Sequence, residues 1–350
     1  FVGTVGRRLG GVAICTYCLC CHVVGDTFTA EDVARNITGW CDKSVEGNSM
    51  AGRFATLIKD DKVIEGGVEV VDSHTVKLNL PAPDISLIAG MADYPASIVH
   101  SSFTAETALT NPIGTGPYKP ESLEVGVKAV LVRNEDHTWW NAGNGAWIDR
   151  IEYIDYGTDP SAWVAASEAE EVDMHYSVDG DYIDIMATLD DWTQHEIVTA
   201  ATIVIRPNQL AEVDGIRPYE DVRVRRAIQM AVDNSVLLEL GYGGRGEPAE
   251  NHHVGPMHPA YAPLPPQVVD PAAAKALLDE AGMGDFEMEL LSIDDAWRKD
   301  TTDAVAAQLR DAGFNVKRTV LPGSTFWNDW AKYPFSSTNW NARPLGVQIW

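Results

Sequence analysis

The feature of this sequence that most constrains its fold is a strand–helix–strand pattern near the C-terminal end. The runs Phe286–Ile293 and Phe314–Leu321 are extended in character, and a helical pattern through Val305 and Leu309 lies between them and stops at Gly313. Two strands joined through a helix are parallel and connected by a right-handed crossover. The pattern predicts an α/β fold in which helices pack on a sheet.

Local signals place further elements along the rest of the chain. Thr29 and Asp32 predict a capping box, and Val33, Ile37 and Trp40 follow it at helical spacing. Helices are also predicted to begin at Asp221 and at Asp270, where proline follows the capping residue and Gly282 ends the helix. Extended runs are predicted at Val68–Val71, Thr75–Leu80, Lys128–Arg133, Ile148–Tyr156 and Ile197–Arg206.

The segment Asn111–Tyr118 reads NPIGTGPY. Two prolines and two glycines in eight residues exclude a helix and predict a shaped turn. Glycine allows the backbone to approach a ligand closely, so Thr115, Gly116 and Tyr118 are candidate binding residues. A tight turn that serves only the fold is the alternative.

The charge balance excludes some classes of partner. The 350 residues include 26 basic and 51 acidic side chains, which gives a formal net charge of -25. Nucleic-acid binding needs a concentrated basic face, and docking on anionic lipid needs basic residues as well. The acidity is typical of a highly soluble protein or of one from a salty habitat.

The cysteines gather at the beginning of the chain. Four of the five are Cys15, Cys18, Cys20 and Cys21, so no disulfide framework is predicted for the main body. Leu9–Val24, after two arginines, is too short to span a bilayer but resembles the core of a signal peptide.

Several segments together resemble family 5 of the bacterial extracellular solute-binding proteins, the oligopeptide, dipeptide and nickel receptors of ABC importers. The motifs that carry the resemblance stand in the order of the family and are Gly25–Val33, Asn111–Tyr118, Val132–Asp136 with Trp139, Asp221–Ile228 with Ala231 and Asp233, and Asp270–Gly282.

The resemblance implies a periplasmic-binding-protein type II fold, in which two lobes with mixed sheets flanked by helices enclose the ligand. Lobe I is expected at residues 25–204 and is partial, and lobe II at residues 205–350 and is incomplete at its C-terminal end. Residues 1–24 are atypical of the family, and a frame error or a signal remnant is expected there.

The resemblance also directs attention to the segment from Asn339 to Pro344, whose equivalent in the family faces the cleft. Arg343 offers a fork of donors that suits a carboxylate, Trp340 suits stacking on a flat or apolar group, and Asn341 lies between them. Asn208, at the crossing between the lobes, is a further candidate. Trp139 is expected in the core.

Two alternative functions are open at this stage. A metal-binding protein would use either His252, His253 and His258 or the cluster Cys15–Cys21, because histidine and thiolate are ligands of nickel and zinc. A hydrolase on a similar α/β scaffold is the second alternative, although the chain has no G-x-S-x-G, H-E-x-x-H or P-loop motif.

The favoured hypothesis is a non-catalytic receptor that needs no cofactor. It is expected to bind a short peptide or a similar small solute by hinge closure and to deliver it to the permease subunits of an ABC importer. The expected location is periplasmic or extracytoplasmic, at the membrane through the transporter. A monomer that binds no nucleic acid is expected.

Overall fold

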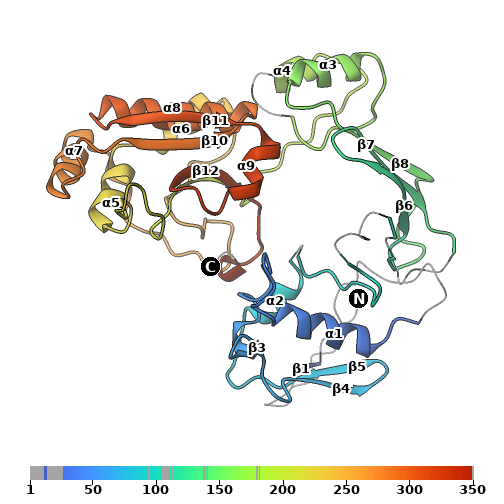
Figure 1. The fold of residues 1–350 in the computed structure, drawn as a ribbon. Coiled ribbons are helices and arrows are strands. Elements are labelled where there is room, and N and C mark those ends of the chain that lie inside the picture. The colour runs from blue at the N-terminus through green and yellow to red at the C-terminus, as the bar shows by residue number, and fades with distance from the viewer. Residues whose placement is uncertain are drawn as a thin grey trace. The chain divides into compact units, whose positions relative to one another are not determined.

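The chain forms two compact units, Phe1–Asp155 and Tyr156–Trp350 (Figure 1). The sequence analysis placed the lobe boundary between residues 204 and 205, whereas residues 156 to 204 group with the C-terminal unit, and their assignment to a lobe stays a prediction. The computed structural model describes residues 12–13, 27–93, 95–104, 107, 110–111, 113–136, 139, 141–178, 180 and 182–348.

The N-terminal unit is organised around helix α1 (Ala30–Trp40) and the hairpin of β4 (Val68–Asp72) and β5 (Thr75–Leu78). The amide of Thr29 donates to the carboxylate of Asp32 at 3.1 Å, which confirms the predicted helix start. The apolar face of α1 is buried in a core that includes Ile37, Trp40, Phe54, Leu57, Leu78 and Ile98.

The other elements of this unit are short or lie in a separate sheet. Strands β6, β7 and β8 form an antiparallel meander, which confirms the extended runs predicted for β7 and β8. The bounds are β1 Val12–Ala13, η1 Ala55–Leu57, β2 Ile58–Lys59, β3 Lys62–Val63, α2 Leu87–Met91, β6 Tyr118–Glu124, β7 Lys128–Arg133 and β8 Arg150–Ile154.

A four-stranded mixed sheet in the order β11-β10-β12-β9 forms the centre of the C-terminal unit. The bounds of its elements are α3 Pro160–Glu168, α4 Tyr182–Met186, β9 Thr202–Pro207, α5 Val222–Met230, α6 Asn234–Tyr242, α7 Pro271–Glu280, β10 Met288–Ile293, α8 Ala296–Asp311, β11 Val316–Leu321, α9 Gly323–Asp329, β12 Phe335–Trp340 and η2 Gly346–Gln348.

The predicted strand–helix–strand unit is confirmed. β10 and β11 are parallel and in register, and α8 connects them (Figure 1). β12 is parallel to β10, and β9 runs antiparallel to β12. The strand predicted from Ile197 is wrong at its start, because β12 ends at Trp340 opposite Thr202 and residues 197–201 pair with no strand among the described residues.

Capping residues set the helix ends of this unit as the sequence predicted. The side chain of Asp221 accepts from the amide of Arg223 at 2.7 Å, and that of Asp270 from the amide of Ala273 at 2.9 Å. Gly282 and Gly313 adopt φ values of 74° and 88°, the left-handed conformation that ends α7 and α8 at low cost.

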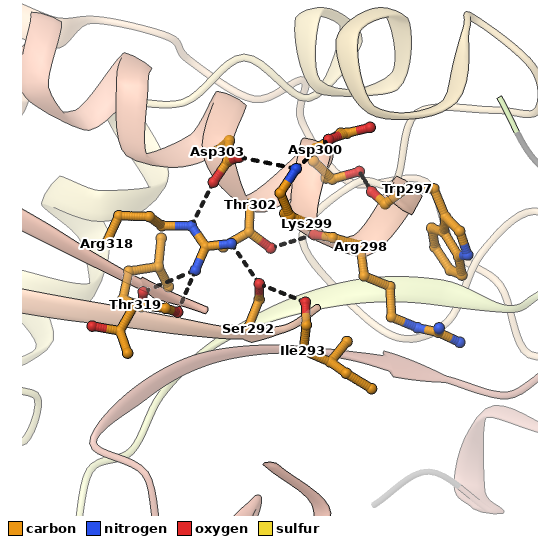
Figure 2. Close-up of polar contacts among 12 residues, drawn as sticks. Ser292, Ile293, Trp297, Arg298, Lys299, Asp300, Thr302, Asp303, Arg318 and Thr319 are labelled. Carbon is orange, nitrogen blue, oxygen red and sulfur yellow. Dashed lines mark hydrogen bonds and ion pairs between the residues drawn. The ribbon is translucent and has the colours of Figure 1, made fainter. Parts of the chain in front are cut away.

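A polar network joins α8 to the sheet (Figure 2). The guanidinium of Arg318 on β11 donates to Asp303 of α8 at 2.7 Å and to the hydroxyl of Ser292 on β10. Burial lowers the pKa of Arg318, because desolvation disfavours its charged form. The carboxylate and the hydroxyl therefore stabilise a cation that is largely removed from solvent.

Throughout the described residues, every helix falls short of the length or the apolar character that crossing a bilayer requires.

Candidate functional site

Three parallel strands of the C-terminal unit end at one edge of their sheet. β10 ends at Ile293, β11 at Leu321 and β12 at Trp340, and the antiparallel β9 begins at the same edge with Thr202. In open α/β sheets ligands bind outside the carboxyl ends of the strands, in the loops that follow them. We refer to this region as the carboxyl edge.

An arginine from α8 reaches the end of β12 at this edge. Nε of Arg298 donates to Oδ1 of Asn339 at 2.8 Å, and Nη1 pairs with the carboxylate of Asp295. The guanidinium lies over the ring of Trp297, with 4.6 Å between its carbon and the ring centroid. Trp297 and Arg298 lie in the first turn of α8 and are labelled in Figure 2. These contacts fix the direction in which Asn339 presents its amide.

Trp340 points to the opposite face of β12, because successive strand residues alternate. Its ring centroid lies 5.6 Å from that of His253, at a tilted angle. Burial, and secondarily the neighbouring His252, lower the pKa of His253, so the neutral imidazole is favoured. The pair forms an aromatic surface on which a flat or apolar group can stack.

Asn341 and Arg343 continue from the end of β12. The side-chain amide of Asn339 donates to Oδ1 of Asn341 at 3.3 Å, and Nη1 of Arg343 donates to the carbonyls of Asn341 and Ala342 at 3.3 and 3.2 Å. The structure therefore brings three predicted residues together, and their arrangement offers amide and guanidinium donors beside an aromatic ring.

The ring of His258 supports this loop through hydrogen bonds to the backbone. The amide of Gly255 donates to Nδ1 of His258 at 2.9 Å, so the hydrogen is assigned to Nε2, which lies 3.1 Å from the carbonyl of Arg343. The histidine is buried. Since both ring nitrogens bond to the backbone, His258 acts here as a brace for the loop that carries Arg343.

The histidines predicted as alternative metal ligands are engaged separately. Nε2 of His252 lies 3.2 Å from the carboxylate of Glu250, whereas His253 packs on Trp340 and His258 bonds to the backbone. The part of the chain that the structure describes holds no group of three or more His, Cys, Asp or Glu side chains suited to a metal ion. The cluster Cys15–Cys21 lies outside the described residues.

Asn208 lies at the other end of the sheet from Trp340. Its neighbour Pro207 is opposite Phe335, five strand positions from Trp340, which corresponds to about 17 Å. Its side-chain Nδ2 donates to the carbonyl of Ala331 at 3.4 Å, and its Oδ1 accepts from the backbone amide of Leu210 at 3.0 Å. Asn208 therefore shapes a local turn, and the structure does not bring it to the carboxyl edge.

The other predicted residues lie in the N-terminal unit. Thr115 and Gly116 belong to the turn before β6, and Tyr118 is the first residue of that strand. The hydroxyl of Tyr118 donates to the carbonyl of Ile148 at 2.8 Å and accepts from its amide at 3.2 Å. A Cβ on Gly116 would stand 3.5 Å from the nearest atom, an ordinary contact, so the turn does not itself require glycine there.

Sequence reasoning missed Trp297, Arg298 and His253 as parts of this site. Trp297 and Arg298 could have been predicted from the sequence. They follow the first strand of the strand–helix–strand unit, so they had to lie near the carboxyl edge. His253 was considered only as a metal ligand, and no local pattern indicates its contact with Trp340.

The sequence is similar to a known protein family and to several curated proteins. Residues 25–348 match the family model described as bacterial extracellular solute-binding proteins, family 5 Middle. The glutathione-binding protein GsiB of Salmonella choleraesuis is 26% identical over 309 residues, which cover 78% of this chain and 57% of the relative. GsiB of Pectobacterium atrosepticum is 25% identical over 275 residues, covering 74% of this chain and 47% of the relative. The chain thus spans about half the length of the curated relatives it matches.

Two solved structures share the fold. AgaA of A. tumefaciens R10, solved in complex with agropinic acid, superposes with a TM-score of 0.79 at 21% identity, over 99% of this chain and 68% of that one. The murein tripeptide binding protein MppA of Escherichia coli gives 0.78 at 21% identity, over 93% and 67%. The fold is therefore the type II periplasmic-binding-protein fold, as the sequence predicted.

Proposed function

The chain belongs to family 5 of the bacterial extracellular solute-binding proteins, and we propose that it is the ligand-binding part of a receptor that delivers a small solute to an ABC importer. One observation carries the proposal. The carboxyl edge gathers the Arg298–Asn339 pair, the Trp340–His253 pair and the Asn341–Arg343 loop at the place where α/β sheets bind ligands.

Each of these groups has a role in holding a solute without changing it. Trp340 stacks on a flat or apolar part of the ligand, and Asn341 exchanges hydrogen bonds with its polar groups. Arg343 contacts a carboxylate, because a guanidinium and a carboxylate form charge-assisted and often paired hydrogen bonds. Arg298 acts indirectly, by fixing Asn339.

The N-terminal unit carries three further candidate ligand contacts in this proposal. Thr115, Gly116 and Tyr118 are proposed as ligand contacts, and hinge closure is the proposed motion that encloses the ligand. Two hydrogen bonds between the Tyr118 hydroxyl and the backbone of Ile148 fix the ring at the start of β6. Enclosure removes both ligand and protein groups from water, which strengthens the polar contacts.

The proposed ligand is a short peptide or a similar small solute that carries a carboxylate. The relatives named above are a glutathione-binding and a murein-tripeptide-binding protein, and AgaA was solved with agropinic acid. These names, together with Arg343 at the edge, support an acidic group on the solute. The closed receptor docks on the permease subunits of the importer, outside the cytoplasm, as a monomer without a cofactor or catalytic step.

A thermal-shift experiment with intact-ligand recovery tests the proposal. The purified protein is mixed with a library of short peptides and related acids, and its melting temperature is recorded for each. A receptor is stabilised by a few compounds and returns each of them unchanged in mass. Stabilisation by none, or conversion of a compound to a product, would contradict the proposed function.

A further inference from the structure

A second surface of the C-terminal unit contains a groove that the candidate site does not use. Its volume is about 260 Å³, and one wall is the outer face of α5 while the other is an extended, proline-containing segment. The lining residues are Arg226, Gln229, Met230, Pro265, Pro266, Gln267 and Val268.

The groove is held in shape before anything enters it. The side-chain amide of Gln267 donates to the carbonyls of Gln229 and Val232, at 2.7 Å each, and the amide of Asp270 donates to the carbonyl of Met230 at 2.9 Å. These bonds satisfy carbonyls at the C-terminal end of α5 that the helix leaves without partners. The protein therefore loses little conformational entropy when a ligand binds in the groove.

The groove is lined by apolar side chains and by the positively charged side chain of Arg226. Met230, the two prolines and Val268 supply apolar surface, and Val268 is 66% exposed. Arg226 is exposed and has no ion pair or hydrogen bond with any residue that the structure describes. The neighbouring arginines of α5 are engaged, since Arg223 pairs with Asp221 and Arg225 donates to the carbonyls of Tyr219 and Glu220.

We propose that this groove docks an extended segment of a partner protein in which apolar side chains flank a carboxylate. The apolar side chains would occupy the space between Met230 and Val268, and the carboxylate would pair with Arg226. The chain has a net charge of -25, and Arg226 forms no ion pair with an acidic side chain among the described residues, so an exposed arginine beside an apolar groove is complementary to such a segment.

Blocked peptides provide a direct probe of this chemistry. Acetylated and amidated Pro-Leu-Glu-Leu, with Pro-Leu-Lys-Leu as its matched control, is titrated into the isotope-labelled full chain. The side-chain amide signals of Gln229 and Gln267 report on groove occupancy. Saturable shifts are expected with the glutamate peptide, and binding at least about tenfold weaker with the lysine peptide. Absence of shifts up to about 10 mM peptide, or equal affinity for both peptides, overturns the proposal.

Variants locate the contact and separate it from the solute site. Arg226→Glu is expected to weaken binding at least about tenfold, and Val268→Lys, which places a charge at the apolar wall, is expected to weaken it as well. Lys332→Glu changes the net charge equally at an exposed site outside the groove and is expected to have no effect. Trp340→Ala is expected to leave the peptide affinity unchanged. Equal affinity in Arg226→Glu and the unmodified chain, or loss of the signal in Trp340→Ala, contradicts the proposal.

Discussion

Nε of Arg298 donates to Oδ1 of Asn339 at 2.8 Å, and this bond links the first turn of α8 to the end of β12. The same guanidinium pairs with Asp295 and lies over Trp297. Both partners of the ion pair are about three-quarters buried or more, so solvent screens the pair less than it screens a surface pair. The contact sets the geometry of the segment that continues to Trp340 and Arg343.

Arg298→Ala is therefore expected to lower the free energy of unfolding by about 1–3 kcal/mol, because it leaves Asp295 and Asn339 without their donor. Lys299→Ala is a matched control on the same helix. Among the described residues, the Lys299 side chain makes surface pairs only, 3.3 Å from Asp300 and 4.0 Å from Asp303, so its loss is expected to stay within about 0.5 kcal/mol. Chemical denaturation followed by circular dichroism measures both, and equal losses would show that the bond is not structural.

Thr338→Val is expected to raise the free energy of unfolding by about 1 kcal/mol. The hydroxyl of Thr338 is buried on β12 and has no hydrogen-bond partner within the described residues, so the folded state loses its hydration without compensation. Ser292→Ala is the contrasting variant, because that hydroxyl accepts from Arg318 and donates to the carbonyl of Ile293 at 3.0 Å. It is expected to destabilise the protein. A stability loss in Thr338→Val would mean that its hydroxyl is satisfied after all.

Cys41 is expected to report on unfolding of the N-terminal unit. Its thiol is buried in the core of that unit, and burial raises its pKa to about 11, so the reactive thiolate is scarce at neutral pH. In a variant with serine at the other four cysteine positions, a disulfide reagent should react slowly with the native protein and quickly in denaturant. Similar rates in both conditions would show that the thiol is accessible.

His175 is expected to make the C-terminal unit less stable in acid. Burial lowers the pKa of His175 below its usual value, so the unfolded chain binds a proton more readily than the folded one. The stability that this group contributes is present above the unfolded pKa of about 6.5 and is lost as the pH falls through the window below it. Nε2 of His175 lies 2.7 Å from the hydroxyl oxygen of Ser167, and the ring packs on Trp192.

Urea denaturation at about pH 7.5 and about pH 5.5 measures this effect in the unmodified chain and in His175→Gln. The variant is expected to lose less stability on acidification. His195→Gln, at an exposed position, is the matched control for the loss of a histidine. An identical acid response in His175→Gln would remove His175 as a source of the pH dependence.

Much of the fold was predictable because its signals are local. The capping residues Asp221 and Asp270, the glycine stops and the alternation of the β4–β5 hairpin depend on residues within a few positions of one another. The parallel pairing of β10 and β11 followed from the intervening helix. The start of β9 was not predictable, because it depends on where the distant β12 ends.

The candidate site was predictable only in part, for the same reason. Trp340, Asn341 and Arg343 are adjacent in sequence and were found together. The contacts that support them join residues far apart in the chain, such as Arg298 with Asn339 and His258 with the carbonyl of Arg343. No periodicity or motif encodes such pairs, and the opposite placement of Asn208 depends on the antiparallel register of β9 and β12.

The most direct test of the account is a calorimetric titration with the solute itself. Ligand released from natively purified protein is identified by mass spectrometry and titrated into the unmodified chain and into Arg343→Ala. The account predicts binding of an unaltered, carboxylate-bearing solute, and an affinity at least about tenfold lower in the variant, since a lost charged contact is worth about 1.5–3 kcal/mol. Unchanged affinity in Arg343→Ala together with unchanged affinity in Trp340→Ala would contradict the assignment of the carboxyl edge as the binding site.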